Sequence, residues 1–417
     1  MNLYRLPQGT AFSLTPFPDL KPLNALSEIN AKDPVFVLSK KDSANNQVCG
    51  LLHHPAHLFE ATESPDWFNE QFFTSDEIAS LPDWLIEQIN NKNAYQLNTA
   101  HPRWKERITL DWTKAKRIHV AGLGDVGSTL LMGLRLLGQS TLSQIGIFDL
   151  SPEKIMRWVH EGNQITSLDY DMFPEIHPLK EEDIFECDIF VFCVARQIPP
   201  IDSDEKDVRM AQFEVNSAII KQYACKARNA GFQGLFAVVS DPVDHLCQVV
   251  YESSNRDEYG IRDEKGLFPE QIKGYGLGVM NARAHYHASL HSEWSCYARE
   301  GRVFGPHGEG LVVADSLINY RDSHSMALTE KTLNSNLAVR QIGFKPYVAP
   351  ALSSACFPIL ATIRCEWHYS TVFMGGIYMG CRNRMVPYGT EWETTPLPEN
   401  LMKRIKHSYR QLERFQW

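Results

Sequence analysis

Residues 117–150 read RIHVAGLGDVGSTLLMGLRLLGQSTLSQIGIFDL, and this stretch specifies the fold of the 417-residue chain. It begins with an apolar run at 118–121, passes through a glycine-rich turn into leucines at helical spacing, and ends on a second apolar run that Asp149 closes. Short apolar runs bounded by turns predict buried strands, and the leucine spacing predicts a helix between them. We therefore expect a strand, helix, strand unit of a parallel sheet.

The turn GLGDVG has the glycines that a dinucleotide site needs. Gly122 permits a tight turn, Gly124 lets backbone N–H groups approach a pyrophosphate, and Gly127 lets the helix pack closely on its strand. The positive end of the helix dipole then faces the phosphates. Asp149 follows Gly127 by 22 residues, near the spacing of a carboxylate that binds the ribose 2′-hydroxyl. A carboxylate there would repel a 2′-phosphate, which favours NAD over NADP.

The composition excludes several classes of protein. The chain is 43% hydrophobic and 22% charged, as globular proteins are, and no apolar run is long enough to cross a bilayer. A net charge of −9 argues against nucleic acid as a partner. The start of the chain lacks a basic segment followed by an apolar one, and the nine cysteines form no CxxC pair. We therefore expect reduced thiols and a cytoplasmic location.

Beyond Asp149 the alternation of helix and strand continues. The pattern predicts helices at 153–163 and 207–230, and buried strands at 188–194 and 234–239. Repeated βα units imply a parallel, doubly wound sheet of the Rossmann type, which binds ligands beyond the carboxyl ends of its strands. We therefore expect chemistry in the segments that leave those ends, which read AGLGDVG, ARQIPP and SDPVD.

The expected fold class is α/β, in three parts. Residues 1–112 are interpreted as a small α/β accessory domain of unknown role. Residues 113–250 are interpreted as a Rossmann domain that binds NAD. Residues 251–417 are interpreted as a mixed α+β catalytic domain, with a hairpin strand at 369–379 and a closing amphipathic helix at 399–415.

The later segments, set beside the Rossmann unit, resemble the lactate/malate dehydrogenase family from about Ala115 to the C-terminus. Five motifs carry the resemblance: the glycine-rich turn with Asp149, Arg209 and Asn216 in RMAQFEVN, VVSDPVD at 238–244, GLGVMNAR at 276–283, and FGPHGEG at 304–310. Each motif is modest evidence when it is taken alone. Five of them in the family's order are hard to attribute to chance.

The resemblance implies an NAD-dependent dehydrogenase that acts on a small 2-hydroxy or 2-oxo carboxylate. Reducing such a substrate requires a hydride from the nicotinamide and a proton from a group that titrates near neutral pH, as histidine does. His307 is the candidate general acid and base, Arg283 would grip the substrate carboxylate, and Arg209 would reach the developing alkoxide from a mobile loop. The predicted cofactor-binding residues are Gly122, Gly124, Asp125, Val126, Gly127, Asp149, Ala195 and Asn216.

Two residues of the predicted pocket depart from the family. The Asp that orients the catalytic histidine is Met280 here, and the Asn that hydrogen-bonds the substrate carbonyl is Asp241. Without a carboxylate partner, the tautomer of His307 should be unfixed and the usual mechanism impaired.

Three hypotheses about these departures remain open. Asp241 supplies the missing negative charge to His307, or it binds a cationic group of an amine or imine substrate. The third hypothesis is an NAD-binding relative with weak activity and a regulatory or scaffolding role.

Several features leave the substrate and assembly open. The segment RQIPPIDSDEKDV between Ala195 and Arg209 is longer than the family leads us to expect, so the residue that selects the substrate side chain cannot be located. No metal site is predicted, because HHPAH has no cysteine or carboxylate at ligand spacing beside it, ARAHYHASLH has no HExxH pattern, and the family that the chain resembles needs no metal. HHPAH is interpreted as solvent-facing loop histidines, and ARAHYHASLH as a polar helix face or subunit contact; the histidines are His53, His54, His57, His285, His287 and His291. The resemblance implies a homo-oligomer, a dimer or a tetramer.

Overall fold

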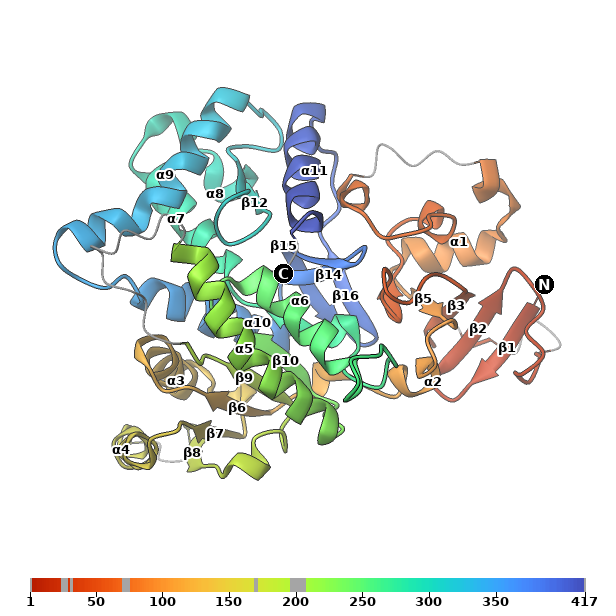
Figure 1. Ribbon diagram of the computed structural model, residues 1–417. Coiled ribbons are helices and arrows are strands. Elements are labelled where there is room, and N and C mark those ends of the chain that lie inside the picture. The colour runs from red at the N-terminus through yellow and green to blue at the C-terminus, as the bar shows by residue number, and fades with distance from the viewer. Residues whose placement is uncertain are drawn as a thin grey trace.

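The computed structural model describes residues 2–23, 29–30, 33–69, 76–168, 172–195 and 208–415, without the side chains of residues 76 and 208–211. Within these ranges the chain forms a five-stranded sheet, a nine-stranded sheet and a two-stranded ribbon, with helices around them. Figure 1 shows the five-stranded sheet, in red and orange, to one side of the other elements. None of the helices in the described ranges is long and apolar enough to span a bilayer.

Six strands make the parallel half of the nine-stranded sheet. They are β6 (Arg117–Ala121), β7 (Gln144–Phe148), β8 (Glu175–Pro178), β9 (Ile189–Phe192), β10 (Leu235–Val238) and β11 (Ile272–Gly274). From the edge inward their order is β8, β7, β6, β9, β10, β11, with every neighbouring pair parallel. The order switches direction between β6 and β9, and ligands of such sheets bind beyond the strands' carboxyl ends at that point. The predicted Rossmann sheet is confirmed.

Helices cover these strands. They are α3 (Asp125–Leu137), α4 (Pro152–Asn163), α5 (Val208–Asn229) and α6 (Val243–Ser254). The strands are continuously apolar because both faces of the sheet are covered, and Ile118, Val191 and Phe236 are fully buried. Local signals set the helix starts: the Ser151 hydroxyl accepts from the Lys154 N–H at the start of α4, just before Pro152.

The other half of the nine-stranded sheet is antiparallel and comes from the end of the chain. Its strands are β14 (His368–Met374), β15 (Ile377–Val386) and β16 (Gly389–Trp392). The hairpin between β14 and β15 turns at Gly375 and Gly376, whose φ angles of +60° and +95° favour glycine. Because β14 pairs with β11, the sheet runs across residue 250, and the domain boundaries stay a prediction.

The remaining C-terminal elements pack on the nine-stranded sheet, on its helices and on one another. They are α7 (Leu277–Ser289), α8 (Tyr297–Glu300), β12 (Arg302–Phe304), β13 (Val312–Ala314), α9 (Asp322–Gln341), the π-helical turn η11 (Pro350–Cys356), α10 (Phe357–Ile363) and α11 (Glu399–Glu413). Strands β12 and β13 pair antiparallel to form the ribbon. The loop between them, residues 305–311, contains His307 and is therefore held at both ends by strand pairing.

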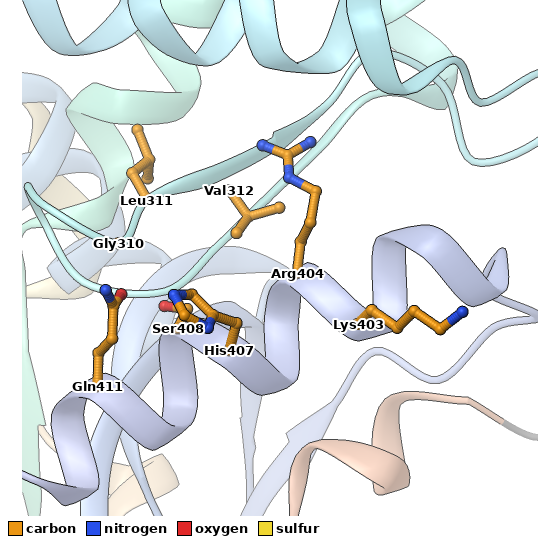
Figure 2. A pocket seen from close by; sticks show the side chains of 8 residues that line it. All are labelled: Gly310, Leu311, Val312, Lys403, Arg404, His407, Ser408 and Gln411. Atoms are coloured by element: carbon orange, nitrogen blue, oxygen red, sulfur yellow. The ribbon is translucent and has the colours of Figure 1, made fainter.

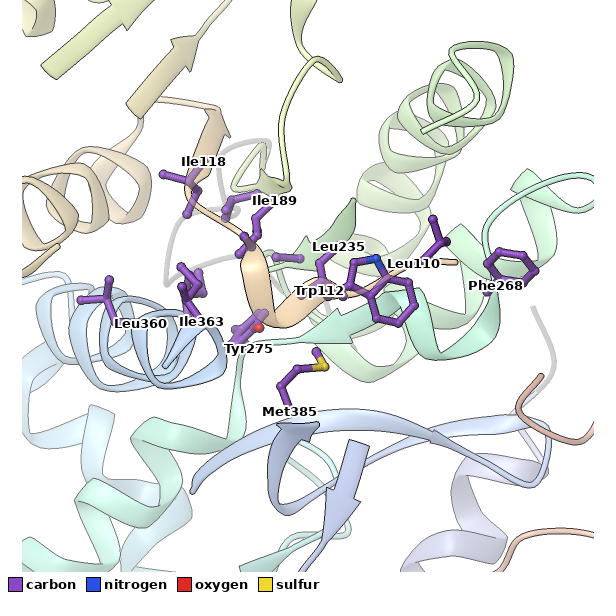
Figure 3. Packing of buried hydrophobic residues seen from close by; sticks show 14 of the residues in the cluster. Leu110, Trp112, Ile118, Ile189, Leu235, Phe268, Tyr275, Leu360, Ile363 and Met385 are labelled. Atoms are coloured by element: carbon purple, nitrogen blue, oxygen red, sulfur yellow. The ribbon is translucent and has the colours of Figure 1, made fainter. Parts of the chain in front are cut away.

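The N-terminal part of the chain has its own sheet, in the order β1, β2, β3, β5, β4. Its elements are β1 (Asn2–Leu6), β2 (Gly9–Ser13), β3 (Val35–Ser39), β4 (Cys49–Leu51), α1 (Asp83–Asn90), β5 (Ala94–Asn98) and α2 (Trp104–Arg107). The segment after α2 leads into the main sheet. In Figure 3, Leu110 and Trp112 of this segment lie with Leu235 and Phe268 in one buried cluster.

A buried ion pair holds the N-terminal unit on the main sheet. The Arg107 Nε lies 2.6 Å from Glu270 Oε1, and the two side chains are 0% and 1% exposed. The Glu270 carboxylate also accepts from the backbone N–H groups of Val48 at 3.2 Å and Cys49 at 2.9 Å. Because Val48 and Cys49 belong to the N-terminal unit, one carboxylate ties its sheet to the start of β11.

The histidines of HHPAH are not solvent-facing, and that prediction was wrong. His53 and His57 are 7% and 0% exposed. The His57 ring stacks on Trp67 with centroids 3.8 Å apart, and His53 Nε2 accepts from the Trp392 N–H at 2.9 Å. Burial lowers the pKa of His53 to about 3, so this ring is neutral. The sequence misled because the two tryptophans that cover the histidines are not adjacent to them in the chain.

A buried glutamate in the N-terminal unit gives a testable pH dependence. Burial raises the pKa of Glu63 from 4.5 to about 7, although its carboxylate accepts from the Gln47 N–H. A carboxyl whose pKa is raised by folding binds its proton more tightly in the native state, so stability falls as pH rises from about 4.5 to about 7. The free energy of unfolding should therefore fall by about 3 kcal/mol across that window.

We expect Glu63→Gln to remove that loss, and urea unfolding at a series of pH values measures it. The exposed neighbour Glu60 supplies the control, since Glu60→Gln should leave the pH dependence as in the wild type. Parallel stability curves for Glu63→Gln and the wild type would contradict the prediction.

Candidate active site

The glycine-rich turn after β6 has the geometry that the sequence predicts. Gly122 has φ +95°, and a Cβ there would lie 2.8 Å from the Cys193 carbonyl carbon. A Cβ on Gly127 would lie 1.8 Å from the Gly122 oxygen, so both positions require glycine. In contrast, no described atom lies within 4 Å of a Cβ built on Gly124. The backbone at the start of α3 is therefore open to a ligand.

Asp149 lies beside this turn at the carboxyl end of β7. Its carboxylate accepts from the backbone N–H of Leu123 at 2.8 Å and of Ser151 at 3.0 Å. The side chain is 13% exposed, and Lys154 Nζ lies 3.7 Å from it. A carboxylate oxygen can accept more than one hydrogen bond, so Asp149 can hold the turn and still accept from a ligand hydroxyl.

Three further cofactor candidates border the same edge of the sheet. Ala195, after β9, is exposed, and the Ser240 hydroxyl joins the ends of β9 and β10 by donating to the Val194 carbonyl at 2.8 Å. Asp125 opens α3, and the Lys345 ammonium lies 3.2 Å from its carboxylate at the surface. Val126 is half-buried in the same turn of helix.

His307 is held from two sides by hydrogen bonds. Its Nδ1 lies 2.8 Å from the Gly276 carbonyl, and its backbone N–H donates to Asp244 Oδ2 at 3.0 Å. A carbonyl oxygen only accepts, so Nδ1 must carry a proton. In the neutral ring Nε2 is therefore the basic atom, and the tautomer is fixed.

The groups that hold His307 are themselves fixed. The Gly276 carbonyl also accepts from the Ser354 hydroxyl, which in turn accepts from the Val279 N–H at 2.9 Å. The second oxygen of Asp244 accepts from the Thr371 hydroxyl at 2.7 Å. Burial raises the pKa of Asp244 from 3.8 to about 6. Near pH 7 this carboxylate is thus ionised, and it anchors the loop of His307.

Asp241 lies on the opposite side of the imidazole from Gly276. Its Oδ1 is 3.8 Å from His307 Nε2, and the side chain is 49% exposed. The Asn216 amide donates to the Asp241 backbone carbonyl at 2.7 Å and so fixes the residue without engaging its carboxylate. The Asp241 carboxylate therefore faces the space in front of Nε2.

Arg283, on α7, lies within electrostatic range of Asp241. Burial lowers its pKa, and the Asp241 carboxylate opposes that effect. Among the described residues its guanidinium has one polar contact, the Met280 sulfur at 3.8 Å. A partly buried guanidinium with so weak a partner is suited to bind an anion. One guanidinium and one imidazole thus flank the Asp241 carboxylate.

No family model matches the chain, but comparisons with known proteins find similar sequences and folds. It is 25% identical over 223 residues to an L-lactate dehydrogenase of Mesomycoplasma hyopneumoniae and 26% identical over 201 residues to that of Bacillus licheniformis. These matches cover 52% and 47% of this chain and 64% and 56% of the relatives, so the chain spans about 60% of their length.

Solved structures show the same fold. A lactate dehydrogenase from a deep-sea metagenome superposes with a TM-score of 0.58 at 16% identity, covering 72% of this chain and 97% of that one. A malate dehydrogenase from Archaeoglobus fulgidus in complex with NADH gives 0.55 at 18% identity, covering 71% and 97%. The chain is a divergent relative of the lactate and malate dehydrogenases.

The ring of His307 is oriented in this divergent dehydrogenase relative. Our expectation of an unfixed tautomer was wrong. Met280 is 2% exposed and packs in an apolar cluster, so it makes no substitute for a carboxylate. The Gly276 carbonyl holds Nδ1 instead. Sequence reasoning missed this group because a backbone carbonyl leaves no signature, and it missed Asp244 although that residue ends the quoted motif VVSDPVD.

The structure leaves two predicted residues untested. Asn216 is 1% exposed and its amide holds the Asp241 backbone, and its contact with a cofactor stays a prediction. Arg209 belongs to the first turn of α5, but its side chain lies outside the described residues, as does the whole of the segment 196–207.

The remaining candidates lie apart from this site. His287 Nε2 bonds the Ser335 hydroxyl of α9 at 2.7 Å, a helix contact, while His285 and His291 are exposed. No group of three potential metal ligands is found within the described ranges. A cavity of about 290 Å³ lies behind the His307 loop, between the Gly310 to Val312 segment and α11, where Figure 2 shows Arg404 and Gln411 at its edge.

Proposed function

We propose that the chain is an NAD-dependent oxidoreductase that moves a hydride between nicotinamide and a small 2-hydroxy or 2-oxo carboxylate. The observation that carries the proposal is that the Asp241 carboxylate lies 3.8 Å from His307 Nε2 and within electrostatic range of the Arg283 guanidinium. That point lies at the carboxyl end of β10, on the same edge of the sheet as the glycine-rich turn. A proton donor and a carboxylate clamp beside a dinucleotide turn are what such a reaction needs.

The residues around the glycine-rich turn fit NAD. Gly124 leaves room for a pyrophosphate at the start of α3, where unpaired N–H groups and the helix dipole favour an anion. Asp149 suits the ribose hydroxyls and disfavours a 2′-phosphate. When bound, nicotinamide supplies or takes up the hydride. The similar malate dehydrogenase from Archaeoglobus fulgidus forms a complex with NADH, which supports the same cofactor here.

The chain's own residues supply binding and proton transfer. Arg283 holds the substrate carboxylate with two parallel hydrogen bonds, and this fixes the neighbouring carbon for attack. His307 gives or takes the proton at Nε2, because Nδ1 is committed to the Gly276 carbonyl. Asp244 and Gly276 keep the ring in place, and Arg209 is proposed to approach the reacting oxygen from its own loop.

Direct assays test this function. Quenching of protein fluorescence by NADH measures cofactor binding, and loss of NADH absorbance with a panel of small 2-oxo acids measures turnover. We expect saturable NADH binding and substrate-dependent oxidation. A protein that binds NADH but oxidises none of it would support the second candidate, a regulatory or scaffolding protein. Met280 and Asp241, which depart from the family pattern, are the residues that favour it.

Assembly and location are carried over from the family. We propose a homo-oligomer, a dimer or a tetramer, in the cytoplasm, acting on a small carboxylate. Light scattering of the purified chain measures the oligomeric state.

Arg283→Gln should raise the KM for a carboxylate substrate about 100-fold, because two charge-assisted hydrogen bonds are lost. The test compares pyruvate with its methyl ester, which lacks the negative charge. The wild type should prefer pyruvate, and Arg283→Gln should lose that preference. Arg299 on α8 supplies the control, since Arg299→Gln should leave it intact. Equal preference in the wild type and Arg283→Gln would remove Arg283 from the site.

A further inference from the structure

We infer that the substrate presents a cationic nitrogen to Asp241, so that the reaction is the reduction of a 2-iminium carboxylate to a 2-amino carboxylate. This inference rests on the proposed function and names its substrate class. It starts from the side of His307 on which Asp241 lies. Had Asp241 stood behind the ring, at Nδ1, it would simply have replaced the family's aspartate.

The geometry places Asp241 in front of the ring. Nδ1 is bonded to the Gly276 carbonyl, so Nε2 is the nitrogen that meets the substrate. Asp241 Oδ1 lies 3.8 Å from Nε2, beyond the range of a hydrogen bond. Its carboxylate therefore borders the place where the reacting bond of the substrate must sit.

A carboxylate in that place discriminates between a carbonyl and an iminium. An ionised carboxylate has only acceptors, and the oxygen of a 2-oxo acid is also an acceptor that gains negative charge during reduction. The two groups would repel each other in the transition state. An iminium N–H instead donates to the carboxylate, and its positive charge is attracted.

The second charge of the site matches the other end of such a substrate. The Arg283 guanidinium, which has only the Met280 sulfur as a polar contact among the described residues, can take the substrate carboxylate. The site then offers a cation for the carboxylate and an anion for the nitrogen. Asn216 fixes the Asp241 backbone and leaves the carboxylate oxygens for the ligand.

The reaction balances without another reagent. The substrate carbon accepts a hydride from NADH and forms a C–H bond, while the carbon–nitrogen π pair moves onto nitrogen. The iminium is reduced to a neutral amine and NADH is oxidised to NAD⁺. No proton has to be delivered during hydride transfer. The protonated Nε2 of His307 can then donate its proton to the amine.

A binding measurement tests the inference without turnover. Calorimetry with NADH present, which cannot react with a ligand that is already reduced, compares racemic alanine, which carries an ammonium, with racemic lactate, which has a hydroxyl in its place. We expect the wild type to bind alanine at least about tenfold more tightly, and Asp241→Asn to lose or reverse that preference. Glu182→Gln, which removes a 71% exposed carboxylate elsewhere, should behave as the wild type and controls for net charge.

Turnover gives the second readout. NADH oxidation is followed with pyruvate plus ammonium chloride, pyruvate plus sodium chloride, and 1-pyrroline-2-carboxylate, a cyclic imine that is stable in water. The wild type should oxidise NADH faster with the two imine mixtures than with pyruvate and sodium chloride. Asp241→Asn should lower the ratio of the imine rate to the pyruvate rate by about 100-fold.

The outcomes separate this inference from the proposed function. The inference would be overturned, and the dehydrogenase kept, if three results were found together. The wild type would reduce pyruvate without ammonium and neither imine mixture faster, it would bind lactate as tightly as alanine, and Asp241→Asn would leave both ratios unchanged. A protein that neither binds NADH nor reduces any of the three mixtures would overturn both.

Discussion

His307→Gln should lower kcat/KM for the reduction by about 1,000-fold, within the range measured for loss of a general acid or base. Glutamine keeps much of the volume and can still donate to the Gly276 carbonyl, but it cannot deliver a proton from the position of Nε2. Because the glycine-rich turn makes no contact with His307, the dissociation constant for NADH should change less than twofold. Steady-state kinetics and fluorescence titration measure the two quantities.

An exposed histidine provides the control for that experiment. His291→Gln, at the end of α7, should leave both quantities as in the wild type. A His307→Gln protein with kcat/KM within threefold of the wild type would show that another group moves the proton. If hydride addition to an iminium limits the rate, the loss should be larger with 2-oxo acids than with imines, since only the oxo acids need a proton at that step.

Arg107→Met should destabilise the protein by about 3–5 kcal/mol, the cost measured when one partner of a buried ion pair is removed. The Glu270 carboxylate would remain buried with only the N–H groups of Val48 and Cys49 to compensate its charge. Urea unfolding measures the loss. Arg107→Met combined with Glu270→Gln should recover part of it, because the amide leaves no buried charge and its oxygen still accepts from one of the two N–H groups.

An exposed ion pair provides the matched control. Arg157 and Glu161 lie one helical turn apart, with side chains 63% and 59% exposed, so Arg157→Met should cost less than about 1 kcal/mol. A similar small cost for Arg107→Met would mean that the N-terminal unit is held mainly by apolar packing around Trp112.

The position of Glu270 connects the N-terminal unit to the site. Glu270 lies two residues before the start of β11, and β11 leads to Gly276, whose carbonyl holds His307. Loss of the Arg107 contact should therefore disturb catalysis only if the start of β11 moves. We therefore expect the N-terminal unit to have a structural role at the candidate site.

Much of the Rossmann sheet and its helices could be predicted from the sequence. Strands β6, β7, β9 and β10 and helices α3, α4 and α5 follow from apolar periodicity, and the glycine-rich turn at 122–127 follows from joining a strand directly to a helix. Asp149 follows at a fixed spacing because one helix separates the two strands. These features are local, so a single stretch of sequence contains them.

The sequence by itself determined the doubly wound sheet, the family resemblance, and the identities of His307, Arg283 and Asp241 as candidates. The tertiary structure alone decided how those three side chains meet, since they come from segments far apart in the chain. It replaced the expected aspartate with the Gly276 carbonyl, and it buried His53 and His57 against distant tryptophans. Neither outcome has a sequence pattern, because hydrogen bonds from backbone groups and contacts between remote segments depend on packing and not on residue order.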